Sequence, residues 1–273
     1  MNIFGRKKKQ KETKKESVIH PEEQQMYEDF EAVKNHPGQI TGWDFDRAFD
    51  FVENYPDSEL AEQLLNQMYA ISPNALKGLS YESAVKVLER MPDHSGADSI
   101  VKGMYKLEAD YIKELTSHVI AYILEIIPDH PLAAELTKAL AHKNIANAYD
   151  FVNAHPESEH ASGVIRAMFK HSPNISLLLF QERMDHPKVD SIFKGIYGIV
   201  SSADIAKLTP NGIIFVLEVA PDHPKIDEML QVLVDVNHIK AFEFVKENPE
   251  HPCIATLKKL IIAKRPHFEK LLA

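Results

Sequence analysis

The stretch PDHPLAAEL, residues 128–136, joins two segments with helical patterning, and it recurs along the chain. Near-copies are PDSELAEQLL at residues 56–65, PDHSGADSIV at 92–101 and PDHPKIDEML at 221–230. With the first proline as the reference position, called the corner, seven copies align with spacings of 36, 36, 28, 28, 37 and 28 residues. The corner residues are Pro56, Pro92, Pro128, Pro156, Met184, Pro221 and Pro249. This self-similarity predicts a repeat protein.

A helix is predicted before each corner. Twelve residues ahead of it, every copy has a side chain suited to capping a helix N-terminus: Asp44, Ser80, Thr116, Asn144, Ser172, Thr209 and Asn237. Pro173 and Pro210 follow two of these caps, at the first helical position. Apolar or small residues recur eight, five and four residues before the corner, which is the spacing of one helical face. We therefore expect a helix of about eleven residues in each copy.

A second helix is predicted after each corner. Apolar residues recur there at five, eight and twelve residues, again on one helical face. Eleven residues on, small side chains would let a neighbouring helix approach closely: Gly103, Ala139, Ala167 and Gly195. Since one such pair cannot bury its apolar stripe alone, copies must stack. The sequence thus predicts an all-α fold, a right-handed α-solenoid of about seven helix-turn-helix repeats with irregular 28/36-residue spacing.

The long spacings carry extra segments that begin near Ser72, Ala109 and Ser202. Each ends with a leucine just before the next cap, and we predict one short helix in each segment. At the C-terminus, RPHFEKLLA (residues 265–273) begins like another first helix and then stops.

The corner itself is acidic at its second residue in all seven copies and carries histidine at its third in five. We interpret this as helix punctuation: an acid favoured by the dipole of the following helix, then a histidine or serine cap before an N1 proline. A pH-sensing or metal-binding role of these histidines is the alternative. Zinc needs three or four convergent ligands, which corners spaced about 10 Å apart do not offer.

Five basic residues lie ten positions after a corner, where they could form a row that binds an acidic peptide. They are Lys102, Lys138, Arg166, Lys194 and Lys259. The simpler interpretation is a cation in the last turn of each second helix, where the dipole favours it.

Charge divides the 273-residue chain into a tail and a body. Residues 1–17 carry +5, whereas the whole chain carries −9, so the remaining residues carry −14. We predict a disordered basic tail at 1–17, an N-terminal capping helix and linker at 18–43 and the helical repeats at 44–273.

An acidic body disfavours a broad nucleic-acid-binding surface. The tail could still contact anionic lipid or nucleic acid, or act as a nuclear import signal, through five residues: Arg6, Lys7, Lys8, Lys9 and Lys11.

Catalytic signatures are missing from the sequence. We find no Gly-rich phosphate loop, G-x-S-x-G, H-E-x-x-H or C-x-x-C pattern, and we expect no enzymatic activity, cofactor or metal.

The single cysteine, Cys253, excludes an intramolecular disulfide and fits a cytoplasmic protein. It stands at a predicted helix start, which could lower its pKa, although a packed thiol is the simpler interpretation. Trp43, the single tryptophan, is expected to pack near the first capped helix. No apolar run is long enough for a membrane span.

The helix–corner–helix unit with PDHP at its joint resembles tetratricopeptide-like and HEAT-like α-solenoid repeat proteins at the level of the class, over residues 44–262. The Trp-Leu-Gly-Tyr signature of the tetratricopeptide family is absent. The resemblance implies a scaffold that holds a peptide or a partner protein on the solenoid surface. Two alternatives remain: a peripheral adaptor acting through the basic tail, and an enzyme of unrecognised type.

Overall fold

The computed structural model describes residues 24, 45–55 and 59–272 of the chain. The chain divides into two compact units, residues 1–76 and residues 77–273. All regular elements among the described residues are helical, so the described protein is all-α, as the sequence predicted.

Several sequence predictions concern residues outside this range. They are the basic tail at 1–17 with Arg6, Lys7, Lys8, Lys9 and Lys11, the capping segment at 18–43 with Trp43, the cap Asp44 and the first corner at 56–58.

The first unit contains α2 (Phe45–Asn54) and α3 (Glu59–Ile71), which pack against each other. Both are amphipathic, and the predicted apolar positions are buried on both: Ala48, Phe51, Val52, Ala61, Leu64 and Met68. The 3₁₀ helix η1 (Pro73–Gly78) spans the boundary between the units.

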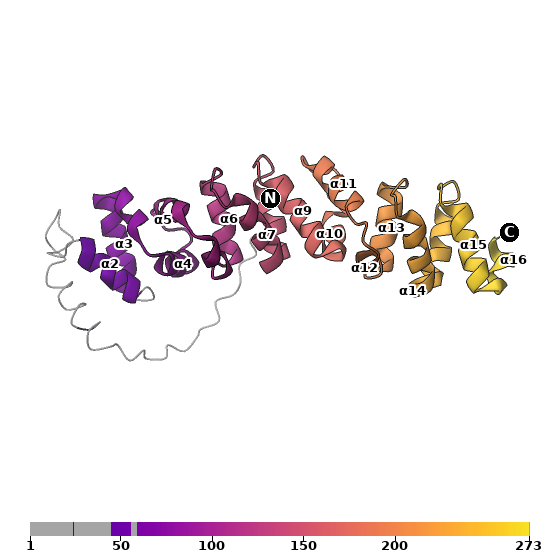
Figure 1. Ribbon diagram of the computed structural model, residues 1–273, viewed down its shortest axis with the longest axis horizontal. Helices are drawn as coiled ribbons and strands as arrows, with labels where there is room; N and C mark the ends of the chain where they lie inside the picture. Colours follow the sequence, from indigo (N-terminus) through magenta and orange to yellow (C-terminus); the bar gives the residue numbers. More distant parts are fainter. Residues whose placement is uncertain (1–23, 25–44, 56–58, 273) are drawn as a thin grey trace. The chain divides into compact units, whose positions relative to one another are not determined.

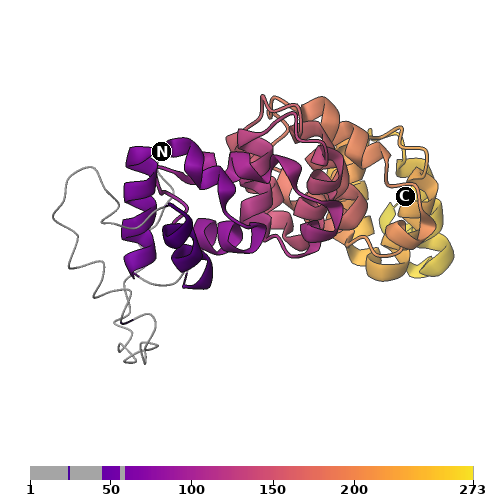
Figure 2. The ribbon, with the colours of Figure 1, turned by 60° about the vertical axis from the view of Figure 1, so that its left-hand side comes forward.

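The second unit is a succession of short helices that follow one another in chain order from one end of the unit to the other (Figures 1 and 2). Its elements are α4 (Tyr81–Arg90), α5 (Ala97–Gly103), η2 (Met104–Lys106), η3 (Ala109–Lys113), α6 (Ser117–Ile126), α7 (Ala133–Lys143), α8 (Ile145–Ala154), α9 (Ala161–His171), α10 (Pro173–Phe180), α11 (Val189–Tyr197), α12 (Ser202–Ile205), α13 (Pro210–Val219), α14 (Ile226–Glu247), α15 (Ile254–Lys264), η4 (Pro266–Phe268) and α16 (Glu269–Leu272). The last two elements show that residues 266–272 are helical, as predicted for the start of this segment.

The predicted caps start the first helices of this unit. The side chains of Ser80, Thr116, Asn144 and Thr209 accept hydrogen bonds from free amides at the starts of α4, α6, α8 and α13. Ser172 starts α10 without such a bond. These bonds matter because the first four amides of a helix have no partner within it.

Asn237 marks the last predicted helix start, and it lies inside α14. The backbone there is non-helical, with φ −151° and ψ 82°, and the Asn237 Oδ1 accepts a hydrogen bond from the Lys240 amide at 3.1 Å. Two helices therefore meet at Asn237 without a loop between them.

Most of the predicted apolar columns form the core. In the column five residues after the corner, three members are only half-buried: Ala133, Val189 and Ile226. The columns at eight and four residues before the corner, and at eight and twelve after it, are buried in every copy. The column at five before the corner has one exception, Leu179, which is half-buried. Leu179 belongs to α10, which ends at Phe180, four residues before its corner Met184. The other first helices of this unit end two residues before their corners.

Each described corner is a pair of consecutive β-turns. At PDHP, the His130 amide bonds to the Ile127 carbonyl at 3.1 Å, and the Ala133 amide bonds to the His130 carbonyl at 2.9 Å. Pro128 and Pro131 occupy the second position of the two turns, where the fixed φ of proline fits. The other described corners, after α4, α8, α10, α13 and α14, have the same two bonds.

This geometry corrects the predicted start of the second helix. That helix begins five residues after the corner, at Ala97, Ala133, Ala161, Val189, Ile226 and Ile254. The prolines three residues after the corner are therefore turn residues and not N1 residues. The acid at the second corner position lies in the first turn of the corner, four residues before the helix, so the helix dipole does not explain it.

Helices pack against their neighbours in the chain and against the next helix but one. First helices contact one another in the series α4, α6, α8, α10 and α13, and second helices do so in the series α7, α9 and α11. Within the two series, helices such as α6, α8 and α9 therefore bury their apolar faces against several helices of the same unit.

The extra segments of the long copies are short helices, as predicted, but two of them are 3₁₀ helices. These segments contain η1, η3 and α12, and the leucine that ends each one is buried: Leu79, Leu115 and Leu208. Element η3 packs against α7.

Two of the predicted small residues permit close helix contacts. A methyl group built on Gly195 would lie 2.3 Å from a ring atom of Phe169 on α9. On Gly103 it would lie 2.5 Å from the Lys77 backbone oxygen. Both distances are too short for any real contact, so the absence of a side chain sets how closely these segments pack.

We predict that Gly195→Ala destabilises the protein by about 1–3 kcal/mol, because the added methyl overpacks against the buried Phe169 ring. Gly163→Ala on α9 is the matched control, since its methyl would meet Thr137 at an ordinary 3.7 Å. The control should be neutral or stabilising by up to about 1 kcal/mol from helix propensity alone. Urea unfolding followed by circular dichroism measures both, and equal effects of the two variants would contradict the packing argument.

Candidate functional site

Three of the described corner histidines, His130, His223 and His251, form hydrogen bonds through both ring nitrogens. Nδ1 accepts a hydrogen bond from the backbone amide two residues on, at 2.9–3.3 Å, in His94, His130, His186, His223 and His251. An amide can only donate, so Nδ1 carries no proton and Nε2 is the protonated nitrogen. The histidine therefore caps the second turn of the corner, a role that the sequence assigned to it in part.

Nε2 joins the corner to an earlier part of the chain. It donates to the Met104 carbonyl from His130 at 3.0 Å, to the Ile196 carbonyl from His223 at 3.2 Å and to the Leu217 carbonyl from His251 at 2.8 Å. These bonds span 26 to 34 residues. They satisfy carbonyls at or near helix ends, which lack helical partners.

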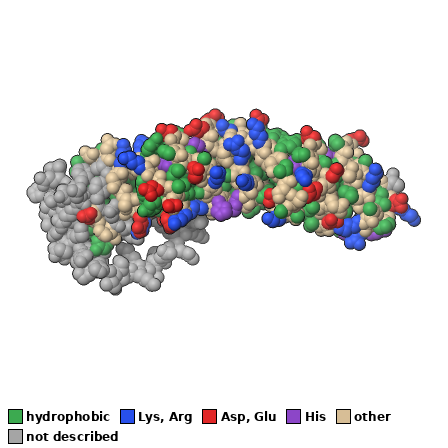
Figure 3. Space-filling view, viewed as in Figure 1, with side chains coloured by type: hydrophobic (Ala, Val, Ile, Leu, Met, Phe, Trp, Pro, Cys, Tyr) green, Lys and Arg blue, Asp and Glu red, His purple; other side chains and the backbone are tan. Residues whose placement is uncertain are grey.

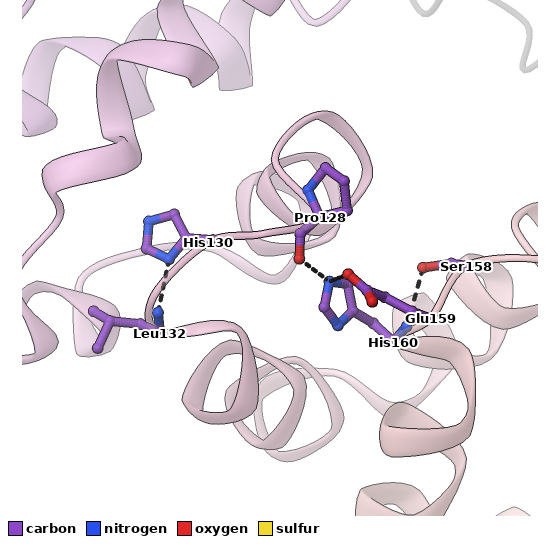
Figure 4. A network of polar contacts seen from close by, with 6 residues as sticks. All are labelled: Pro128, His130, Leu132, Ser158, Glu159 and His160. Atoms are coloured by element: carbon purple, nitrogen blue, oxygen red, sulfur yellow. Dashed lines mark hydrogen bonds and ion pairs between the residues drawn. The ribbon is translucent and has the colours of Figure 1, made fainter.

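The corner at Pro156 divides the same task between two side chains (Figure 4). Ser158 stands where the other corners have histidine, and its Oγ accepts the His160 amide at 3.2 Å. The His160 ring, which follows, donates from Nε2 to the Pro128 carbonyl at 2.7 Å. Two different sequences thus give the same turn cap and, in each case, a hydrogen bond to a carbonyl of the preceding copy.

Burial favours the neutral form of two of these rings. Desolvation lowers the pKa of His186 and His223 below the ordinary 6.5. His186 Nε2 makes no hydrogen bond of ordinary geometry, although the Val152 carbonyl acts on the ring electrostatically and offsets part of this shift. Protonation would also place a hydrogen on Nδ1 against an amide hydrogen. His186 and His223 are therefore structural groups that fold in the neutral state.

The acidic residues of the described corners are exposed. Asp222 accepts a hydrogen bond from the Tyr197 hydroxyl, which raises the pKa of that tyrosine. Over the described part of the chain, no three side chains of His, Cys, Asp or Glu are grouped so that they could hold a metal ion.

The basic row predicted from the sequence is exposed at all five positions. Lys102 and Lys194 lie in the last turn of α5 and α11, where the helix dipole explains a cation. Lys138, Arg166 and Lys259 lie near the middle of α7, α9 and α15, where the dipole gives no such reason. Because α7, α9 and α11 pack in order, Lys138, Arg166 and Lys194 come from successive helices of one layer.

One hollow contains a member of this row. It has a volume of about 480 Å³ and is lined by Lys138, Ala139 and His142 of α7 and by Ala167, Lys170 and His171 of α9. The Nδ1 atoms of His142 and His171 are 3.0 Å apart, and their ring centroids are 4.2 Å apart. Every charged or titratable side chain that lines this hollow, which we call the basic hollow, is a base.

Sequence reasoning missed the basic hollow because His142, Lys170 and His171 fall at the ends of helices, outside the conserved columns of the alignment among copies. Only Lys138 belonged to the predicted row. A signal was present in the sequence. The segments AHK (141–143) and FKH (169–171) end two consecutive second helices, and each contains one histidine and one lysine.

Two other hollows have mixed charge. One lies by the Pro156 corner and includes Glu125, with its Oε2 3.6 Å from His155 Nε2. The other is lined in part by Tyr81 and Tyr111, whose rings meet edge to face, and by the ion pair Glu82–Lys86. Both combine acids with bases, so neither favours one sign of charge in a ligand.

Cys253 is buried, and burial raises the pKa of its thiol to about 11. It precedes the first residue of α15, and its Sγ lies 3.0 Å from His251 Nδ1. Desolvation therefore outweighs the helix start, and the thiol packs as a small apolar group.

No helix among the described residues is long and apolar enough to cross a membrane. Comparison of the chain with protein-family models, curated proteins and solved structures finds no match. No family model therefore supports the resemblance to tetratricopeptide-like and HEAT-like repeats. The packing of the helices is compatible with a helical repeat fold.

The lowered pKa values of His186 and His223 predict a pH-dependent stability. Since folding lowers the pKa of His186 and His223, the unfolded chain binds more protons below pH 6.5. The contribution of these two histidines to the free energy of unfolding should be fully present above their pKa in the unfolded chain. It should decrease as the pH falls from that pKa toward their lower pKa in the folded protein, by up to about 1.4 kcal/mol per pH unit for each histidine. Urea unfolding between pH 5 and 8 measures the slope.

The double variant His186→Asn, His223→Asn tests this assignment, because asparagine can still accept the amide of the turn but does not titrate. Its stability should be lower at all pH values and should depend less on pH than that of the wild type. The exposed His118→Asn change is the control and should leave the slope unchanged. A wild-type slope retained in the double variant would refute the role of these two rings.

Cys253 is expected to resist alkylation in the folded protein. At pH 8 a thiol with a raised pKa contains little thiolate, and burial blocks access. Iodoacetamide labelling followed by mass spectrometry should therefore be slow in native buffer and fast in urea. Rapid labelling of the native protein would contradict the packed state of the thiol.

Proposed function

We propose that this protein is a non-catalytic scaffold, a right-handed α-solenoid of about seven repeats that binds an acidic segment of a partner protein along its second helices. The layers of first and second helices that contact each other in chain order support the solenoid. The corner hydrogen bonds, which join one copy to an earlier one, support it as well.

The observation that carries the binding proposal is the basic row. Three of its members stand at mid-helix, where the helix dipole does not account for them. Within the described structure, neither Lys138, Arg166 nor Lys194 has a hydrogen-bond or ion-pair partner. Exposed cations without internal partners are available to a ligand. These cations stand out because the net charge of the chain is −9.

The spacing of the row suits an extended acidic segment. Packed helices lie about 8–10 Å apart, and an extended chain rises about 3.3 Å per residue, so carboxylates about three residues apart would meet successive cations. Acidic and basic side chains are interspersed on the face shown in Figure 3, with no broad basic surface of the kind that nucleic acid requires. A narrow row therefore favours a peptide over a duplex.

The alternative proposal is an adaptor that contacts anionic lipid or nucleic acid through the tail. The +5 charge of residues 1–17 in an otherwise acidic chain favours it. Deletion of 1–17 should abolish sedimentation with anionic liposomes if this is the function, and should leave peptide binding by the helical part unchanged.

Charge reversal tests the main proposal. The triple variant Lys138→Glu, Arg166→Glu, Lys194→Glu should weaken binding of a fluorescent Glu-rich peptide at least about tenfold, since like charges then face the ligand. The matched control reverses three exposed lysines outside the second helices, Lys77, Lys106 and Lys207. Fluorescence anisotropy at two salt concentrations gives the affinities. Equal losses in the two triple variants would mean that net charge, and not the row, governs binding.

A further inference from the structure

The basic hollow between α7 and α9 gathers four nitrogen bases in one place, two from each helix. Lys138 and His142 are four residues apart on α7, and Lys170 and His171 end α9. All four are exposed, and two alanines form the rest of the lining. This arrangement differs from the extended row, whose cations are distributed over successive helices.

A metal ion is not the ligand that the lining favours. Two imidazole nitrogens 3.0 Å apart could approach one ion, but a stable site needs further ligands. No carboxylate or thiolate lines the hollow, and the remaining polar groups are two ammonium groups, which repel a cation. Four bases without an acid indicate an anion.

The histidine pair can add positive charge without losing its contact. In the neutral pair one Nδ1 donates its hydrogen to the other, as the 3.0 Å distance requires. One additional proton makes both outer nitrogens, Nε2, donors and leaves the Nδ1–Nδ1 hydrogen bond in place. With Lys138 and Lys170, the lining then carries up to three positive charges.

Charge within the hollow comes from α7 and α9 alone. No residue of the neighbouring elements α6, α8, α10, α11 or η3 lines it in the described structure, so Lys138 and Lys170 are the charged groups that share it with the histidines. Lys143, the next residue after His142, is directed elsewhere, since its Nζ donates to the Lys113 carbonyl of η3 at 2.6 Å.

We infer that the basic hollow is a subsite for a phosphate monoester, the phosphorylated side chain of a partner peptide that binds along the basic row. The inference rests on the proposed function and specifies its ligand. A phosphate monoester carries about −1.5 to −2 charge and three acceptor oxygens, which match several donors at one point, whereas a carboxylate carries one charge and two oxygens. Lysine binds phosphate as a point charge, so the flexible Lys138 and Lys170 fit this ligand.

The test compares three labelled Glu-rich peptides that differ at one residue, which is phosphoserine, aspartate or serine. With the full-length protein, fluorescence anisotropy should show the phosphopeptide binding about tenfold more tightly than the aspartate peptide, because charge-assisted hydrogen bonds are added at the hollow. Inorganic phosphate should compete for that advantage. Nuclear magnetic resonance signals of His142 and His171 should shift on titration with the phosphopeptide.

The double variant Lys170→Met, His171→Asn removes one half of the hollow and leaves the predicted row intact. It should bind the phosphopeptide and the aspartate peptide with nearly equal affinity. The exposed pair Lys246→Met, His118→Asn is the matched control and should keep the wild-type preference. Circular dichroism confirms that both variants fold.

Each other outcome overturns the inference. If the wild type binds the phosphopeptide and the aspartate peptide equally, the hollow does not recognise phosphate, while the row and the proposed function stand. If the preference persists in the double variant, phosphate binds elsewhere. If zinc shifts the two histidine signals and phosphate does not, the hollow is a metal site. If no peptide binds, the proposed function and the inference fail together.

Discussion

Two consecutive β-turns at each described corner are the constraint on which the rest of the structure depends. Proline sets the backbone at the second position of the first turn in all described corners except that of Met184, and the histidine or serine caps the second turn by accepting an amide. In four of the six described corners, the same histidine or its neighbour His160 donates to a carbonyl of an earlier copy. One short stretch therefore turns the chain between two helices and, at these four corners, also joins the helix pair to the preceding part of the chain.

Copy length decides which surfaces the helices present to one another. Where the spacing is 28 residues, α7, α9 and α11 pack in direct succession, and the basic hollow forms between α7 and α9. Where the spacing is 36, the extra residues fold into a short helix such as η3, which packs against α7. Copies of unequal length thus pack differently, and the basic hollow forms between one pair of helices.

The helix caps and the core could be predicted from residues alone, because both depend on contacts within one or two turns of helix. Ser80, Thr116, Asn144 and Thr209 were identified as caps from their spacing to the corner, and the structure confirms them. The start of the second helix was predicted too early, because a proline after the histidine fits both a helix start and a turn. The pairing of His142 with His171 joins residues 29 apart that occupy different positions in their copies, so an alignment of the copies does not reveal it.

The sequence by itself determined the period of the chain, the type of its elements, the buried face of each helix and the exposed basic row. Those features follow from local geometry, since helical spacing and turn chemistry act over a few residues. Tertiary structure decided which carbonyl each corner histidine reaches, how closely Gly195 lets α11 approach α9, and that four bases converge in one hollow. These depend on distances between helices, which result from the packing of many side chains at once and are not encoded in any single stretch.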